Sequence, residues 1–187
     1  LKALDLFCSA GGVSRGLMDA GFHVTGVDIR PQPRYIGHAF FQADAMTFPL
    51  EGFDAIHASP PCQHYSIMRN LPWLQNKEYP ALIEPTRERL EASGVPWVIE
   101  NVYGARRNKR RLDGMQAGWL CGQMFGLPFL RHRMFETNFF WLQPGHARHW
   151  GTVRNGRQPG DHLKRGNGAQ APAANVGHAA GFAMAKE

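Results

Sequence analysis

Short apolar runs alternate with turns and helices along the first hundred residues. The apolar runs predict five buried strands, at residues 3–7, 22–27, 39–43, 53–57 and 96–99. Helical patterns fill residues 14–20 and 85–92, and a glycine follows closely after each. Strands that alternate with helices predict an α/β fold with a parallel sheet, and ligands bind such sheets at the carboxyl ends of the strands.

The pattern weakens beyond residue 100. Residues 122–135 resume apolar character, and residues 134–141 predict one more strand. From residue 143 onward glycine, proline, histidine and arginine replace the residues that build a core, which predicts irregular, partly disordered chain. We therefore expect a folded domain over residues 1–142 and a basic extension over residues 143–187.

The charge of the chain favours a polyanionic partner. The 187 residues fit one domain with a sizeable core, and their formal net charge is +6. Much of this charge crowds one short segment, Arg106, Arg107, Lys109, Arg110 and Arg111. The segment fits either a solvated loop or a patch that contacts phosphates, and both readings stay open.

Nothing in the sequence predicts membrane insertion or secretion. No apolar run approaches the roughly 20 residues of a membrane helix, and the N-terminus lacks the pattern of a signal peptide. The three cysteines, Cys8, Cys62 and Cys121, are far apart, odd in number and without a CxxC pair. They predict neither a disulfide framework nor a zinc site, so we expect no metal and a reducing, cytoplasmic setting.

Two side chains that could take part in catalysis follow buried strands. Pro60 and Pro61 close the fourth strand, so Cys62 is expected at the carboxyl edge of the sheet. The alternative is a half-buried structural cysteine after a tight turn. Glu100 follows the fifth strand, with Asn101 beside it, and a carboxylate there is costly unless it is paired or functional.

The ends of the first three strands carry groups that suit an adenosine. A turn of small residues, Cys8-Ser9-Ala10-Gly11-Gly12, lets a ligand approach the backbone and opens a helix N-terminus. Asp28 follows roughly twenty residues later, the spacing at which an acid meets ribose hydroxyls. Phe7 and Asp44 would add an aromatic face and an acceptor for an exocyclic amine. The alternative for Asp28 is a surface acid before a proline-rich loop.

Four short motifs occur one after another along the chain. They are Asp5-Leu6-Phe7-Cys8-Ser9-Ala10-Gly11-Gly12, Pro60-Pro61-Cys62-Gln63, Glu100-Asn101-Val102 and Pro128-Phe129-Leu130-Arg131-His132-Arg133. In this order they resemble the cofactor loop, the two catalytic motifs and the Pro-Gln-x-Arg-x-Arg segment of the cytosine-C5 DNA methyltransferases, which use S-adenosyl-L-methionine (SAM). The match spans residue 4 to about residue 135. It implies a Rossmann-like SAM-dependent methyltransferase fold, with a mostly parallel, doubly wound sheet.

The resemblance implies transfer of a methyl group from SAM to C5 of cytosine in DNA. Because C5 is a poor nucleophile, a thiolate at Cys62 would first add to C6. Glu100 would act as a carboxyl donor at ring N3, and Arg133 would stabilise charge near O2. Arg131 would support the loop after Cys62, and Asn101 would orient the Pro-Cys backbone.

The resemblance also implies the binding residues. Those expected at the cofactor are Asp5, Phe7, Cys8, Ser9, Ala10, Gly11, Gly12, Asp28, Ile29, Asp44, Ala45 and Pro60. Those expected at DNA are Gln63, Ser66, Arg106, Arg107, Lys109, Arg110 and Arg111. The target cytosine would be flipped out of the duplex, with the loop over residues 64–79 closing on it. We expect a monomer in the cytoplasm of a bacterium or a phage-infected host.

The chain departs from the family at several positions. Ser9 stands where the family usually has glycine, Asp28 where it has glutamate, and Phe129 where it has glutamine. About fifty residues follow Arg133, which is short for a target-recognition domain and resembles compact, phage-encoded members. The extension would then contact phosphates with little sequence specificity. RNA or a free cytosine nucleotide as acceptor, a modified SAM donor, and an inactive SAM- or DNA-binding module remain alternatives.

Overall fold

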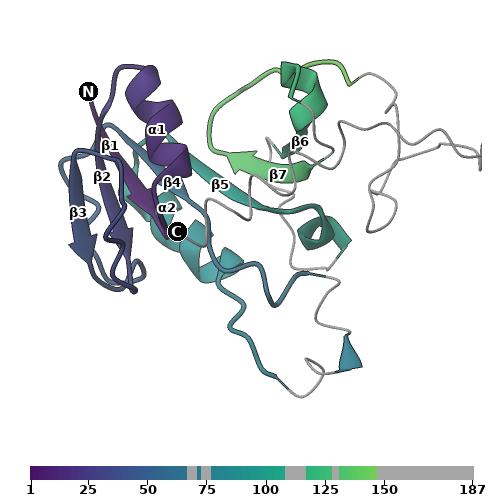
Figure 1. Ribbon diagram of the computed structural model, residues 1–187, viewed down its shortest axis with the longest axis horizontal. Helices are drawn as coiled ribbons and strands as arrows, with labels where there is room; N and C mark the ends of the chain where they lie inside the picture. Colours follow the sequence, from purple (N-terminus) through teal and green to yellow (C-terminus); the bar gives the residue numbers. More distant parts are fainter. Residues whose placement is uncertain (67–70, 73–76, 108–116, 128–130, 147–187) are drawn as a thin grey trace, which may run out of the picture. The chain divides into compact units, whose positions relative to one another are not determined.

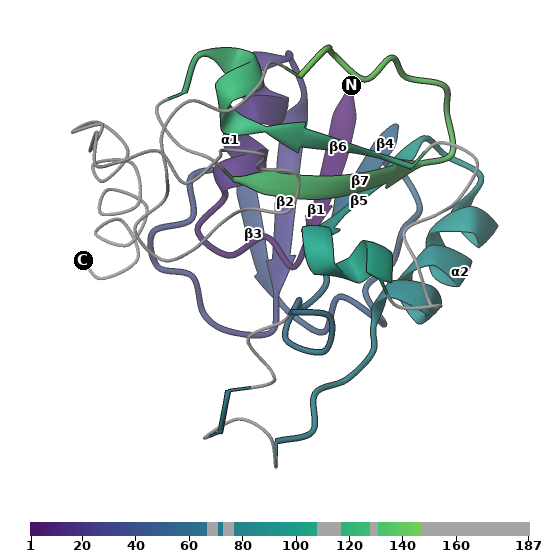
Figure 2. The same cartoon turned by 90° about the vertical axis from the view of Figure 1, so that its right-hand side faces the viewer.

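A mostly parallel sheet organises the residues that the structure describes. These are residues 1–66, 71–72, 77–107, 117–127 and 131–146 of the computed structural model. The strands are β1 (Lys2–Leu6), β2 (His23–Asp28), β3 (Ala39–Gln42), β4 (Ala55–Ala58), β5 (Trp97–Val102), β6 (Gly118–Cys121) and β7 (His132–Thr137). Their order across the sheet is β3-β2-β1-β4-β5-β7-β6. In Figure 2, β3, β2, β1 and β4 stand in this order from left to right.

The strands β1 to β5 pair in parallel, and β1 is the point where their order reverses. The chain passes from β1 outward to β2 and β3, then returns to the other side of β1 to form β4 and β5. Such a reversal opens a crevice at the carboxyl ends of the two strands that flank it. Both β1 and β4 end there in segments that the sequence singled out.

Two helices cover this sheet. Helix α1 (Gly12–Asp19) packs on β1 and β2, and helix α2 (Ile83–Ser93) packs against β5. Figure 1 shows both beside the strands that they connect. Helix α1 connects β1 to β2, and α2 connects β4 to β5 in the opposite direction along the sheet. Because crossovers between parallel strands are right-handed, the two helices cover opposite faces, and the sheet is doubly wound. Two short 3-10 helices, η3 (Tyr103–Arg107) and η4 (Gly122–Phe125), follow β5 and β6.

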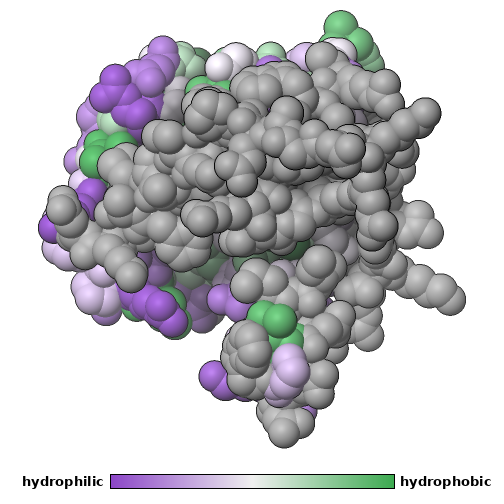
Figure 3. Space-filling model, turned by 45° about the vertical axis from the view of Figure 1, so that its right-hand side comes forward, coloured by the Kyte–Doolittle hydropathy of each residue, from purple (hydrophilic) through white to green (hydrophobic). Residues whose placement is uncertain are grey.

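The central strands are buried on both faces, mostly by apolar residues, with Asp5 and His57 as buried polar exceptions. In β1 every residue from Ala3 to Leu6 is buried, as expected for a parallel strand covered on both sides. In α2 the buried residues are Ile83, Thr86 and Leu90, which share one helical face. Where Figure 3 colours the surface, hydrophilic side chains (purple) prevail and hydrophobic ones (green) form separate patches. None of the helices in the described ranges has the length and hydrophobicity that crossing a bilayer requires.

The chain divides into two compact units. The first comprises residues 1–118 and 134–141, and the second comprises residues 119–133 and 142–187. In the first unit, Asn138 accepts a hydrogen bond from the Trp97 amide (2.8 Å) and donates one to the Val95 carbonyl (2.9 Å). The end of β7 therefore lies beside the start of β5, which is the arrangement of antiparallel neighbours.

The structure confirms the predicted α/β class and the five strands and two helices, with ends that shift by up to three residues. Glu100 and Asn101 lie inside β5 and not beyond it, because β5 extends to Val102. The strand predicted at residues 134–141 is wrong at both ends, since β7 begins at His132 and ends at Thr137. Strand β6 was not predicted, because its four residues are too few to show a period.

Candidate active site

The loop between β1 and α1, which we call the glycine loop (residues 7–11), has an unusual backbone. Phe7 and Ser9 have positive φ angles of 59° and 47°, in a region that residues other than glycine seldom adopt. Gly11 follows with φ 92° and caps α1 without a side-chain hydrogen bond. Backbone hydrogen bonds hold the loop, from the Cys8 amide to the Val27 carbonyl (3.1 Å) and from the Gly11 amide to the Cys8 carbonyl (2.9 Å). Such backbone strain gathers at ligand sites.

Asp28 ties this loop to the end of β2. One carboxylate oxygen accepts the Ser9 amide at 3.0 Å, and the other accepts the Arg30 amide at 2.9 Å. A carboxylate has about four acceptor positions, so capacity for further donors is left. The neighbouring Ile29 is 67% exposed and leaves an apolar side chain at this edge.

A buried hydrogen-bonded network of polar side chains adjoins the glycine loop. In the sheet register Asp5 is level with Gly26 of β2 and His57 of β4. Its carboxylate accepts hydrogen bonds from the Ser14 hydroxyl (2.5 Å) and from Nδ1 of His57 (3.0 Å). Because Ser14 donates its proton to Asp5, it accepts from the Tyr35 hydroxyl at 2.9 Å. Burial raises the pKa of Tyr35 to about 12, so it keeps this proton at neutral pH.

Of these four residues, only Asp5 was expected at a ligand site from the sequence. A signal for the partners was present, because Asp5 and His57 are polar residues within otherwise apolar strands. Such residues are buried only with partners. Their pairing depends on the register between β1 and β4, which local patterns do not contain.

Substitution of Gly26 tests how tightly this network packs. A Cβ at Gly26 would overlap the ring of Tyr35. We expect Gly26→Ala to lower the free energy of unfolding by about 1–3 kcal/mol in urea titrations, as overpacking does. Gly16→Ala is the matched control: a Cβ there meets nothing within 4 Å, and alanine in a helix raises stability by up to about 1 kcal/mol. Equal effects of the two changes would contradict a fixed Tyr35.

Helix α2, which comes later in the chain, holds the turn after β3 in place. Asp44 accepts the Met46 amide at 2.8 Å, and Ala45 beside it is buried. The Arg89 guanidinium donates to the carbonyls of Ala45 (2.9 Å) and Phe48. Burial lowers the pKa of Arg89. Arg89 was not expected here from the sequence, since an arginine on a helix is usually solvated.

Cys62 opens a tight turn after β4, which we call the cysteine turn (residues 62–66). Its carbonyl accepts the amides of Tyr65 (3.0 Å) and Ser66 (2.9 Å), while its side chain is partly exposed. Just before it, the buried Asn101 side chain of β5 donates to the Pro60 carbonyl at 2.8 Å. The Ser59 amide donates to the Leu6 carbonyl at 3.1 Å, which joins this segment to the end of β1. The cysteine turn and the glycine loop thus start from neighbouring points of one sheet edge.

Tyr65 anchors the cysteine turn to the start of α2. It is 3% exposed, and its hydroxyl accepts the Ile83 amide at 3.0 Å and donates to Glu84 at 3.4 Å. Nearby, Nδ1 of His64 lies 3.1 Å from the Tyr79 carbonyl. The beginning and end of the 64–79 segment are therefore fixed, while residues 67–70 and 73–76 lie outside the described residues.

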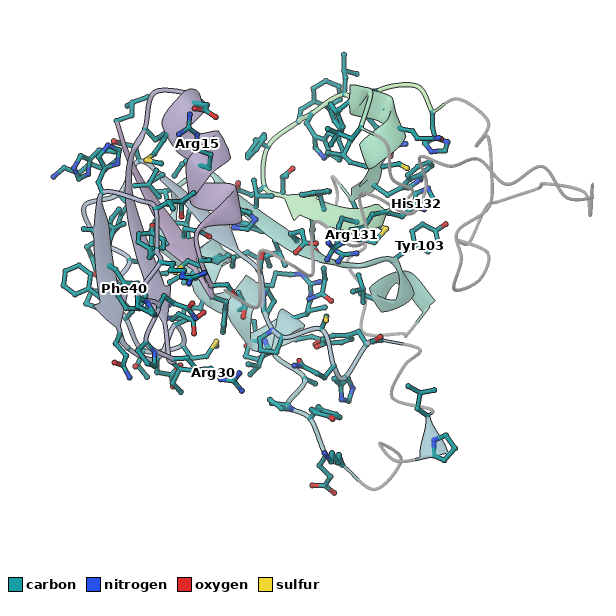
Figure 4. The ribbon with its side chains drawn as sticks, in the orientation of Figure 1. Arg15, Arg30, Phe40, Tyr103, Arg131 and His132 are labelled. Atoms are coloured by element: carbon teal, nitrogen blue, oxygen red, sulfur yellow. The ribbon has the colours of Figure 1, made fainter. Side chains whose placement is uncertain are left out.

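Glu100 precedes Asn101 on β5, so it is at the same carboxyl edge as Pro60 and is half-buried. Of the arginine segment, Arg131 is exposed and stands beside His132 where β7 begins, as Figure 4 shows. Arg133 donates to the carbonyl of His132 at 3.1 Å. Both arginines belong to the second unit, whereas Cys62 belongs to the first.

The expected DNA-contacting residues are spread over several segments. Gln63 is exposed and Ser66 half-buried in the cysteine turn. The backbone of Arg106 and Arg107 ends η3. Lys109, Arg110 and Arg111 lie outside the described residues, as does Phe129. Their role stays a prediction.

The two cysteines of the first unit differ in their surroundings. Cys8 is buried, and desolvation together with the charges of Asp5 and Asp28 raises its pKa to about 12. Its thiol is therefore protonated at neutral pH and makes a poor nucleophile. Cys62 is the more accessible thiol at this edge.

Solved structures share the fold. The S. pombe Dnmt2 methyltransferase is 21% identical, with a TM-score of 0.55 over 76% of this chain and 51% of that protein. A mutant of Spodoptera frugiperda DNMT2 is also 21% identical, with a TM-score of 0.55 over 75% of this chain and 51% of that protein. The chain thus spans about half the length of each. No protein-family model and no curated protein matches it. The chain has the Rossmann-like fold of SAM-dependent methyltransferases.

Proposed function

We propose that this chain transfers a methyl group from SAM to C5 of cytosine in DNA. One observation carries the proposal: at the reversal of strand order, the turn that presents Cys62 starts beside the strained glycine loop. A nucleophile and a nucleotide-type loop at one crevice suit a reaction between a bound cofactor and a bound base. The likeness to methyltransferases supports the cofactor, and the motif resemblance supports the base.

The residues at the loop fit SAM. Gly11 ends the loop without a side-chain cap, so the first amides of α1 lack a competing acceptor from that residue. Ser9, Ala10 and Gly12 are exposed, which leaves the loop surface open to a ligand. Asp28 has acceptor capacity for ribose hydroxyls, and Ile29 offers an apolar contact for adenine. When bound, SAM supplies an electrophilic methyl group on its sulfonium.

Cys62, after β4, and Glu100, on β5, would activate the cytosine. The Cys62 thiolate would form a bond to C6, which moves electron density onto C5. Glu100 would donate a hydrogen bond or proton at N3, so that negative charge on the ring is neutralised. After C5 receives the methyl group, the C5 proton would pass to water and the C6–sulfur bond would break, which restores the Cys62 thiolate. N3 would return its proton to Glu100, so that the ring and the carboxyl group regain their starting states. Asn101 holds the Pro60 carbonyl, which keeps the cysteine turn in place.

Product analysis tests the proposal. The purified chain is incubated with methyl-labelled SAM and unmethylated duplex DNA, and the DNA is digested to nucleosides. We expect label in 5-methyldeoxycytidine, identified by mass spectrometry. Label in another nucleoside, or none in any acceptor, would contradict the proposal.

Parallel reactions with single-stranded DNA, RNA and deoxycytidine monophosphate identify the acceptor. A flipped duplex cytosine predicts faster transfer to DNA than to the free nucleotide, because phosphate contacts add binding free energy. A higher rate on RNA would reassign the acceptor and keep the cysteine chemistry. Retention of SAM without transfer to any acceptor would favour a binding module.

A further inference from the structure

The second unit contains a cluster of one cysteine and two histidines. Cys121 ends β6, His132 begins β7, and His146 lies fourteen residues further along the chain. The sulfur of Cys121 and one ring nitrogen of each histidine all lie within 4.8 Å of one another. Cys121 and His132 are buried, and His146 is half-buried. Three separate segments thus bring their donor atoms to one point.

The surroundings of the cluster orient these side chains. The Trp119 ring contacts His132 edge-on, with centroids 5.0 Å apart, and His146 in the same manner at 4.7 Å. Trp119 and Cys121 are two apart on β6, so their side chains share a face. One apolar ring therefore borders the donors and restricts the access of water on its side.

The Cys121 sulfur also receives a hydrogen bond. The backbone amide of Met124, in the first turn of η4, donates to it. Outer contacts of this kind orient the ligands of metal sites.

We propose that Cys121, His132 and His146 bind a zinc ion. Thiolate and imidazole are the ligands that zinc prefers, in sites with four tetrahedral positions. A point equidistant from atoms 4.8 Å apart is about 2.8 Å from each, so shifts of about 0.5–0.8 Å bring the donors to Zn–S and Zn–N distances of about 2.0–2.3 Å. Water or another donor takes the fourth position.

The site would connect β6, the start of β7 and residue 146. Zinc binding of this kind adds directly to the free energy of folding, since the unfolded chain has no preformed site. The expectation from sequence that the chain holds no metal rested on the missing CxxC pair. Here the donors are dispersed along the chain, and only the fold brings them together.

Metal analysis of the full-length chain tests the proposal. After purification with a reducing agent and without chelators, we expect about one zinc per chain by elemental mass spectrometry. Cys121→Ser and His146→Ala should each lower the zinc content at least tenfold. Cys62→Ser is the matched control, because it removes a more exposed thiol of the first unit, and it should keep its zinc.

Cobalt substitution keeps the test independent of the stability of the variants. Co(II) added to the metal-free wild-type chain should give thiolate-to-cobalt charge-transfer absorption and the visible bands of four-coordinate cobalt, and stoichiometric Zn(II) should remove both. Absence of these bands, with no stoichiometric zinc in the purified chain, would overturn the proposal. Full zinc content in both Cys121→Ser and His146→Ala would equally overturn it, as adventitious binding elsewhere.

Discussion

Replacement of Cys62 by alanine is expected to lower the rate of methyl transfer to DNA at least about 10³-fold, with the fold and SAM binding retained. Without the thiolate no bond to C6 forms, so C5 stays too weak a nucleophile. The Cys62 side chain is partly exposed, and the turn around it depends on its backbone carbonyl, so alanine leaves those contacts intact. The measurement is label transfer per enzyme under saturating DNA, with SAM binding by calorimetry. Unchanged transfer would remove Cys62 from the mechanism.

Trapping with a modified base separates the role of Cys62 from that of Cys8. DNA that contains 5-fluorocytosine cannot lose a proton from C5, so the enzyme should remain covalently attached. Peptide mapping should place the adduct on Cys62. Cys8 should stay unmodified, because its raised pKa of about 12 keeps the thiol protonated at neutral pH. An adduct on Cys8 would contradict the assignment.

Replacement of Arg87 by methionine should cost about 3 kcal/mol of unfolding free energy in urea titrations. Arg87 of α2 makes a two-pronged ion pair with Glu136 of β7, with N–O distances of 2.6 and 2.8 Å. Glu136 is 1% exposed, so methionine would leave its carboxylate buried without this partner. The expected value is at the lower end for buried pairs because Arg87 is itself 19% exposed.

Two further variants test this explanation. Arg87→Met combined with Glu136→Met should be at least about 1 kcal/mol more stable than Arg87→Met alone, since both charges are then removed. Arg15→Met breaks the exposed pair with Asp19, in which both side chains are at least 60% exposed, and should cost less than about 1 kcal/mol. A double variant no more stable than Arg87→Met would show that the cost comes from lost packing.

The elements were predictable because their patterns are local. The strand before Cys62 and the turn of small residues after β1 each appear within a dozen residues of sequence. Their convergence followed from one rule, that parallel strands bring their carboxyl ends to the same edge. The predicted positions of Asn101 and Pro60 on that edge agree with the hydrogen bond between them. The catalytic and binding roles stay predictions.

The interactions that the sequence did not reveal join residues far apart in the chain. The pairing of Asp5 with His57 depends on register, and that of Arg89 with the turn at Ala45 depends on where α2 packs. The dispersed donors of the second unit were overlooked for the same reason. Local periodicity predicts the helices and strands, whereas the polar contacts between them can be seen only in the assembled fold.

Ser9 bears on how distant relatives of this chain can be recognised. It holds φ 47°, a conformation that glycine adopts at little cost, and the resembling family usually has glycine there. The shape of the loop is thus preserved by amide contacts such as that of Ser9 with Asp28, and not by the identity of the residue. A search that demands glycine would pass over chains of this kind. One that scores the backbone path after the first strand would retrieve them.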